Sequence, residues 1–204
     1  MRNVLAIGAH PDDIELGCGG TLLQHVAAGD VVTMLVVTKG EVGPGNTAVR
    51  LAEQEHACQV LGVDNLIWGS LPDCSVSLYE LALVHLIESA IKSTRAHVVY
   101  THSIQDSHQD HRAVALASTG AARKISSILT YDAPSSLRFQ PTTFVDISTA
   151  LDKKIDALLC HASQVDASDM VDARRVRAQA IARGHESRCE AAEAFEPIRT
   201  LWAI

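Results

Sequence analysis

The chain has 204 residues, of which 47% are hydrophobic and 20% charged, as in ordinary globular proteins. Seventeen basic and 24 acidic residues give a net charge of −7 at pH 7, which argues against a broad nucleic-acid-binding surface. The absence of a signal-like start and of any apolar run of roughly 18 residues predicts no membrane span, and five dispersed cysteines predict a reduced, cytoplasmic protein.

Strand-like and helix-like segments alternate through the first half of the chain. Short apolar or β-branched runs predict strands at Val4–Ala9, Val31–Thr38, Asn65–Trp68, His97–Thr101 and Ser127–Tyr131. Amphipathic runs between and beside them predict helices at Gly19–Ala28, Thr47–Leu61, Leu78–Lys92 and Asp110–Arg123. Such alternation is typical of βαβ units with right-handed crossovers. We therefore expect an α/β chain with a three-layer Rossmann-like fold and a mainly parallel central sheet.

The second half of the chain is less regular. We expect a short strand at Thr143–Ile147 and helices at Thr149–Cys160 and Ser168–Arg183. Ser148 and the polar residues 166–169 are suitable caps for these helices. No repeat, low-complexity linker or change of composition divides the chain, so we expect residues 1–204 to form a single domain.

Polar clusters follow three of the predicted strands. They are AHPDD (residues 9–13), TKGEVGPGN (residues 38–46) and THSIQDSHQDHR (residues 101–112). In an open parallel sheet, ligands bind beyond the carboxyl ends of the strands. We therefore expect these clusters to face one another across a single cleft, although each has a structural alternative as a helix cap or a solvated loop.

The first cluster has the composition of half a metal site. His10 and Asp13 are three residues apart in one turn and can converge on one ion, which a histidine from another strand end would complete. A bound metal lowers the pKa of water, and a carboxylate that is not a ligand can then accept a proton from that water. The adjacent Asp12 and Asp13 suit this division of labour, with one carboxylate on the metal and the other near the water.

AHPDDIELGCGGTL followed by HQDHR resembles the PIG-L/LmbE-like N-deacetylases, a family of zinc hydrolases that includes N-acetylglucosaminyl deacetylases. Weaker similarities extend along the chain, at Arg50 with Glu53, at PSSLRFQPTTFVDIS (residues 134–148), at HASQ (residues 161–164) and at AEAF (residues 192–195). The resemblance implies hydrolysis of an N-acetyl group on an amino sugar or sugar conjugate, with release of acetate. It also implies a small-molecule substrate, and homo-oligomers occur in the family.

The resemblance also implies roles for individual residues. His10, Asp13 and His111 would bind Zn²⁺, with Fe²⁺ as an alternative because imidazole and carboxylate ligands suit both ions. Asp12 would be the general base, and His108 would stabilise the oxyanion and protonate the leaving amine. Asp110 would orient His108 and favour its protonated form. Arg50 would contact substrate, with a surface position on its helix as the alternative.

Two departures from the family pattern bear on these roles. Many members have glutamate directly after the second aspartate, whereas Ile14 intervenes here and Glu15 follows. Asp106 stands where some members have a mobile tyrosine, so the oxyanion partner known from those members is missing here. Other functions that remain open are an amidase for another amide, such as a thiol–sugar conjugate, a metallophosphoesterase, and a metal- or nucleotide-binding module without catalysis.

Overall fold

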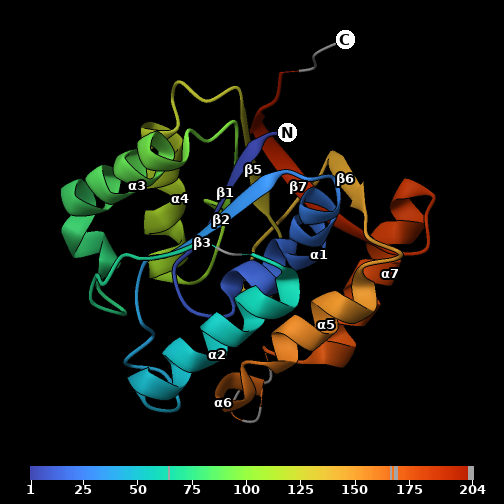
Figure 1. The fold of residues 1–204 in the computed structure, drawn as a ribbon, viewed down its shortest axis with the longest axis horizontal. Coiled ribbons are helices and arrows are strands. Elements are labelled where there is room, and N and C mark those ends of the chain that lie inside the picture. Colours follow the sequence, from blue (N-terminus) through green and yellow to red (C-terminus); the bar gives the residue numbers. More distant parts are fainter. Residues whose placement is uncertain (64, 166, 168–169, 202–204) are drawn as a thin grey trace.

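The computed structural model describes all residues except 64, 166, 168–169 and 202–204. Its centre is a seven-stranded sheet with the strand order β3-β2-β1-β4-β5-β7-β6 (Figure 1). The strands are β1 (Asn3–Gly8), β2 (Val31–Val36), β3 (Asn65–Trp68), β4 (Val98–His102), β5 (Ser127–Tyr131), β6 (Thr143–Asp146) and β7 (Ala192–Arg199). β1 to β5 pair in parallel, and β7 is antiparallel to both β5 and β6. The expected α/β fold with a mainly parallel sheet is thereby confirmed.

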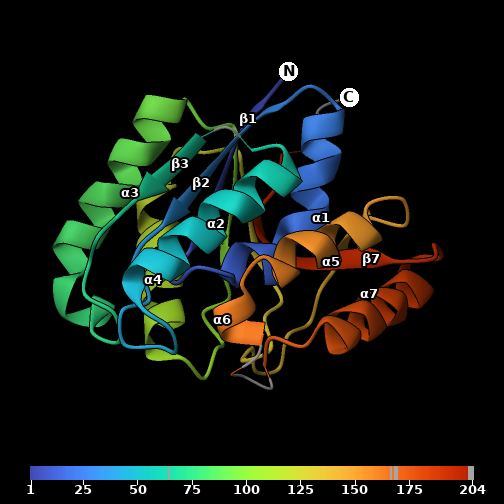
Figure 2. The ribbon, with the colours of Figure 1, turned by 60° about the horizontal axis from the view of Figure 1, so that its bottom comes forward.

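Helices cover both faces of the sheet, as Figures 1 and 2 show. They are α1 (Asp13–Ala27), α2 (Thr47–Leu61), α3 (Glu80–Thr94), α4 (Gln109–Ala121), α5 (Leu151–Leu159), α6 (Ala162–Val165) and α7 (Ala173–Ser187), with a 3-10 helix η1 (Val76–Tyr79) before α3. One face packs against α3 and α4, and the other against α1, α2, α5 and α7. In Figure 2, α2 and α5 lie side by side over the second face.

β1 shows why the central strands are apolar throughout. Its alternate residues Val4 and Ala6 contribute to the core beneath α1, α2, α5 and α7, whereas Leu5 and Ile7 contribute to the core beneath α3 and α4. Successive side chains of a strand point to opposite faces of the sheet, so a strand covered on both faces needs an unbroken apolar run. The polar residues that follow β1 therefore mark the point where the chain leaves the core.

α1 begins earlier than the sequence predicted. The expected helix, Gly19–Ala28, corresponds to the second half of α1, because Cys18 has non-helical angles (φ −143°, ψ 16°) that divide the helix. The carboxylate of Glu193 accepts hydrogen bonds from the backbone N–H groups of Gly20 (2.9 Å) and Thr21 (2.6 Å), directly after this kink. A residue from β7 thus caps the second half of α1, which local sequence patterns cannot reveal.

The C-terminal part differs most from expectation. β7 was not predicted, because its sequence AEAFEPIR contains a proline and three charged residues that obscure the alternation of a strand. α7 begins at Ala173, where Asp172 accepts hydrogen bonds from the N–H groups of Arg174 and Arg175. The residues expected as caps, Asp166, Ser168 and Asp169, lie outside the described residues.

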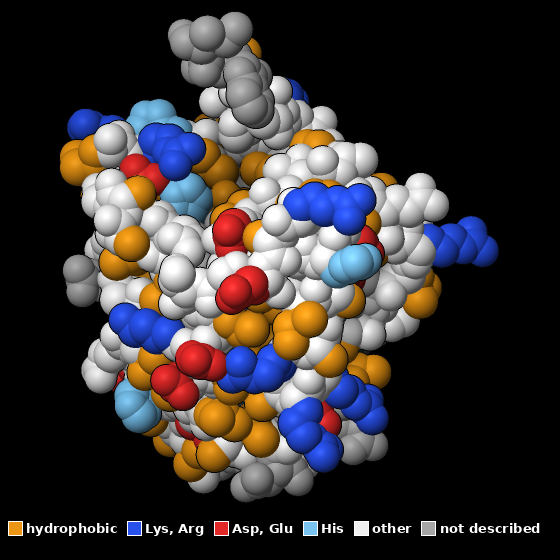
Figure 3. Space-filling view, turned by 90° about the vertical axis from the view of Figure 1, so that its right-hand side faces the viewer, with side chains coloured by type: hydrophobic (Ala, Val, Ile, Leu, Met, Phe, Trp, Pro, Cys, Tyr) orange, Lys and Arg blue, Asp and Glu red, His pale blue; other side chains and the backbone are white. Residues whose placement is uncertain are grey.

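The remaining helix boundaries agree with the expected ones to within a few residues. On the side of the molecule that carries α7, acidic and basic side chains are interspersed (Figure 3). Arg177 of α7 contacts Asp152 of α5 at 2.6 Å on the surface. Across the described residues, every helix is too short or too polar to cross a lipid bilayer.

Candidate metal centre

The predicted site residues lie between β1 and β4, where the order of the strands in the sheet changes direction. From β1 the chain continues to β2 and β3 on one side, whereas β4 and β5 lie on the other side. Such switch points leave a crevice at the carboxyl edge of the sheet. His10, Asp12 and Asp13 lie in the turn from β1 to α1, and His102, Asp106, His108, Asp110 and His111 lie between the end of β4 and the first turn of α4.

Asp13 lies between the two histidines predicted as metal ligands. Its Oδ1 atom is 3.3 Å from Nε2 of His111, and its Oδ2 atom is 3.4 Å from Nδ1 of His10. Two ligand atoms of a tetrahedral zinc ion are about 3.3–3.5 Å apart, given metal–ligand distances of about 2.0–2.2 Å. Each of these two pairs of atoms therefore has the spacing of two ligands on one ion.

Two further histidines extend the group of candidate ligand atoms. One group consists of ring nitrogens of His10, His108 and His111, which lie within 4.8 Å of one another. A second group, with the same limit on the distances, consists of ligand atoms of Asp13, His102 and His111. The predicted set of His10, Asp13 and His111 is divided between these two groups, and His111 belongs to both. His102 is fully buried at the end of β4, and its ring stacks on that of His111 with centroids 3.9 Å apart.

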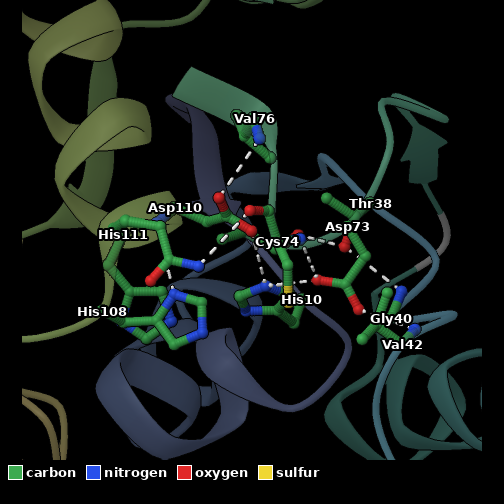
Figure 4. A network of polar contacts seen from close by, with 12 residues as sticks. His10, Thr38, Gly40, Val42, Asp73, Cys74, Val76, His108, Asp110 and His111 are labelled. Carbon is green, nitrogen blue, oxygen red and sulfur yellow. Dashed lines mark hydrogen bonds and ion pairs between the residues drawn. The ribbon is translucent and has the colours of Figure 1, made fainter. Parts of the chain in front are cut away.

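In both predicted histidine ligands, the ring nitrogen that faces away from Asp13 contacts a carboxylate. Nε2 of His10 lies 3.0 Å from Asp73 and 3.3 Å from Asp110, as Figure 4 shows. Nδ1 of His111 lies 3.1 Å from Asp106. Metal-binding histidines in general present one ring nitrogen to the metal and the other to a carboxylate or carbonyl. His10 and His111 both have this arrangement, with the remaining nitrogen directed to Asp13.

The charges around Asp13 favour a bound cation. Burial alone would lower the pKa of His111, but the charge of Asp13 and the hydrogen bonds to Asp106 and Asp13 raise it to about 9. When Nδ1 of His111 donates its hydrogen to Asp106, the lone pair of Nε2 faces an oxygen of Asp13 at 3.3 Å. Two acceptors in such contact need a proton or a metal between them. Imidazole and carboxylate donors suit Zn²⁺ or Fe²⁺, so the residues fit the expected ion.

Asp12 lies beside the candidate ligands, and its carboxylate is 3.9 Å from the guanidinium of Arg50. It precedes α1 with φ 99°, and its carboxylate makes no capping hydrogen bond. Burial and the charge of Asp13 raise the pKa of Asp12 to about 7, while the charges of His161 and Arg50 act in the opposite direction. A general base works best when its pKa is near the operating pH. The geometry therefore favours a reactive over a structural role for this carboxylate.

His108 and Asp110 are arranged differently from the expectation. The Asp110 carboxylate contacts His10 and accepts a hydrogen bond from the N–H of Val76 (3.2 Å), so it does not orient the His108 ring. His108 instead accepts a hydrogen bond at Nδ1 from the backbone N–H of Asp110 (3.2 Å). Its pKa is lowered by burial and by His10 and His111, which outweigh the attraction of Asp110. In the neutral ring the hydrogen is therefore on Nε2.

Arg50 is buried and does not lie on the surface of α2. Its guanidinium donates to the carbonyl oxygens of Gly40 (2.6 Å) and Pro11 (3.2 Å) and lies 3.9 Å from Asp12. Gly40 has φ +64°, and a Cβ atom there would overlap the Arg50 guanidinium at 2.1 Å. The glycine-rich cluster after β2 thus accommodates Arg50 beside the candidate base.

Sequence reasoning missed Asp73 and the role of Asp106. Asp73 follows β3 in the stretch Leu71–Ser75, and it was overlooked because a single carboxylate in a turn is unremarkable in a sequence. The rule that ligands gather at strand ends was the one signal for it. Asp106 occupies the place of the family tyrosine, but it holds His111 and accepts a hydrogen bond from Ser135 Oγ (3.0 Å).

Comparisons with known proteins found relatives of this chain by sequence and by fold. The model of the PIG-L family, described as GlcNAc-PI de-N-acetylase, matches residues 5–122. The uncharacterized deacetylase YaiS of Escherichia coli is 37% identical over 152 residues, which cover 72% of this chain and 82% of that protein. Diacetylchitobiose deacetylase of Thermococcus kodakarensis is 27% identical, with 80% of this chain and 70% of that protein covered. The crystal structure of the conserved protein TT1542 from Thermus thermophilus superposes with a TM-score of 0.89 at 27% identity, covering 100% and 98% of the two chains.

Proposed function

The chain belongs to the PIG-L family, and from this premise we propose that it is a zinc-dependent hydrolase that removes an N-acetyl group from an amino sugar or sugar conjugate. The observation that carries the proposal is the arrangement around Asp13, where two histidines face one carboxylate while the neighbouring Asp12 carboxylate makes no capping hydrogen bond and lies 3.9 Å from Arg50. The deacetylase relatives support the reaction class. Diacetylchitobiose in the name of one relative supports an N-acetylated sugar as the substrate.

His10, Asp13 and His111 would hold the metal. Zn²⁺ in such a site lowers the pKa of bound water and polarises a carbonyl group, and Fe²⁺ is the alternative ion. Asp106 would keep Nε2 of His111 free by binding its Nδ1, and Asp110 and Asp73 would do the same for Nδ1 of His10. The carboxylates would thereby fix the orientation of both rings before the metal arrives.

Asp12 would accept the proton of the attacking water as the water oxygen bonds to the amide carbon. His108 would present its Nε2–H to the substrate, because its Nδ1 is occupied by the backbone N–H of Asp110. As a neutral donor, this group would stabilise the developing oxyanion, and Asp12 would pass the proton that it took from the water to the nitrogen. The C–N bond then breaks, acetate leaves, and the free amine carries the proton that the nitrogen received.

Arg50 is proposed to act on the base side of the site, through its contact with Asp12 and the loop after β2. A direct contact of Arg50 with the substrate stays a prediction. An Arg50→Lys variant tests it, because loss of a bidentate guanidinium contact raises KM. The cytoplasmic location and the assembly into homo-oligomers likewise stay predictions.

Acetate release from a panel of N-acetylated sugars by the zinc-loaded protein tests the proposal. Asp12→Ala should lower kcat by about 10²–10⁴-fold, since that is the usual contribution of a general base. Asp12→Asn is the matched control for shape, and it should be equally impaired. Near wild-type activity in either variant, or protein that takes up no divalent metal, would overturn the mechanism.

A further inference from the structure

Unpaired polar atoms gather around Asp12. Among the buried side-chain nitrogen and oxygen atoms of the described residues, six lack a hydrogen-bond partner. Four of the six belong to three residues near Asp12, namely Oε2 of Glu15, Nε of Arg50 and both ring nitrogens of His161. Burial of a polar atom without a hydrogen-bond partner lowers the stability of the fold, so four such atoms in one place indicate a functional role.

A chain of contacts leads from His161 to the backbone of Asp12. His161 lies in the turn between α5 and α6, fully buried, with Nε2 at 3.6 Å from Oε1 of Glu15. The same oxygen accepts a hydrogen bond from Nε2 of Gln54 (2.6 Å). Oε1 of Gln54 in turn accepts a hydrogen bond from the N–H of Asp12 (3.4 Å). Three separate segments of the fold, α1, α2 and the α5–α6 turn, thus converge on one peptide group.

The Glu15 carboxylate decides which way the Gln54 amide faces. An ionised carboxylate only accepts hydrogen bonds, so the NH₂ end of the amide must point to Glu15. The carbonyl end must then point to Asp12, where it receives the backbone N–H. His161 lies beside the same Glu15 oxygen, with Nε2 at 3.6 Å.

α2 holds both polar atoms of the peptide group between Pro11 and Asp12. Gln54 contacts the N–H of Asp12, and Arg50, four residues earlier on the same helix face, contacts the carbonyl of Pro11. Asp12 has φ 99°, which residues other than glycine rarely adopt. A side chain on such a backbone keeps its direction only if the surrounding structure maintains the conformation.

We propose that Glu15 and His161 are positioning residues for the catalytic base Asp12, acting through the amide of Gln54. This inference rests on the proposed function, in which Asp12 accepts a proton from water. Among the described residues, the side-chain hydrogen bonds and ion pairs of Glu15 and His161 lead to Gln54 and to each other, and none reaches His10, Asp13 or His111. Their contribution is to hold the Pro11–Asp12 backbone so that the carboxylate is aimed at the reacting water.

Glu15→Gln and His161→Gln test the inference, because both keep the approximate size of the side chain. The first replaces a carboxylate that only accepts hydrogen bonds by an amide that can also donate, so Gln54 is free to turn, and the second removes the imidazole beside Glu15. In the zinc-loaded enzyme we expect kcat to fall roughly 10–100-fold in each, the effect of a small displacement of a catalytic group. KM and the zinc content should be unchanged. The double variant should lose no more than the more impaired of the two single variants, since both residues act through Gln54.

His25→Gln is the matched control. His25 is also buried on α1 beside a carboxylate, Asp30 at 2.8 Å, but it contacts Tyr100 and lies outside the site. This change should lower the melting temperature and leave kcat of the folded protein unchanged. If His161→Gln fails to fold, Glu15→Gln decides alone.

The outcomes separate this inference from the proposed function. If Asp12→Asn is inactive while Glu15→Gln and His161→Gln keep wild-type kcat, only the positioning role is overturned. Loss of zinc in parallel with kcat, or a double variant whose loss equals the product of the single losses, also contradicts it. If Asp12→Asn is fully active, the proposed reaction itself fails.

Discussion

Two groups of buried charged residues in this molecule differ in how well their charges are compensated. Lys154 and Glu193 form a buried ion pair, and Lys154 also donates to the carbonyl of Leu16 while Glu193 caps the second half of α1. At the candidate metal centre, carboxylates and imidazoles lie close together, and beside it four buried atoms of Glu15, Arg50 and His161 lack a hydrogen-bond partner among the described residues. We infer from this difference that the first group stabilises the fold, whereas the second offers ligand atoms to the proposed metal ion.

The largest effect is expected from His111→Ala, which removes a predicted metal ligand common to both groups of candidate ligand atoms. The protein should lose its bound zinc. Its activity should fall by more than the roughly 10–100-fold that is typical when a residue that orients a metal ligand is replaced. Metal analysis and acetate release measure the two losses. Folding should be preserved, because the site contributes little to the core. Full zinc content in this variant would contradict the assignment of His111.

Lys154→Met should destabilise the fold by about 3–5 kcal/mol, because the Glu193 charge would stay buried without its partner. Urea unfolding measures this change. Arg177→Met is the control, since its ion pair with Asp152 is exposed and such pairs contribute about 0–1 kcal/mol. Zinc affinity should be unaffected in both variants. A drop in zinc affinity without a loss of stability in Lys154→Met would erase the distinction between the two groups.

Asp106→Asn should weaken zinc binding about 10–100-fold, because the carboxylate that orients His111 would be replaced by a neutral amide. Competition with a chelator measures the affinity. Asp30→Asn provides the comparison, since Asp30 also contacts a histidine nitrogen, that of His25, outside the site. Equal zinc affinities in the two variants would show that Asp106 has no special role.

The smallest effect concerns the pH dependence of stability at His25. Burial lowers the pKa of His25, and the hydrogen bond to Asp30 only partly opposes this. Below about pH 6.5 the unfolded chain therefore binds a proton that the folded chain does not, and stability falls as the pH decreases. His25→Gln should flatten the stability profile between about pH 7 and the lowered pKa, as thermal unfolding across this range would show. An unchanged slope would point to other groups.

Local patterns in the sequence were sufficient to predict the parallel strands β1 to β5. The apolar runs of β1, β2 and β4 have no other stable place than a strand covered on both faces, and the polar clusters after them had to lie at one edge. The pairing of the turn at His10–Asp13 with the segment at His108–His111 followed from the same rule and from the family resemblance. β7 was not predicted because its proline and three charged residues obscure the alternation of a strand.

The sequence by itself determined which residue types were available for a metal site, since it places imidazoles and carboxylates at two strand ends. Only the tertiary structure decided which atoms face each other. Asp110 holds His10 instead of His108, Asp106 holds His111, and Asp73 reaches His10 from a third strand end. The physical reason is that a hydrogen bond is directional over about 3 Å, so its partners depend on the packing of α1, α2 and α4 and not on sequence spacing.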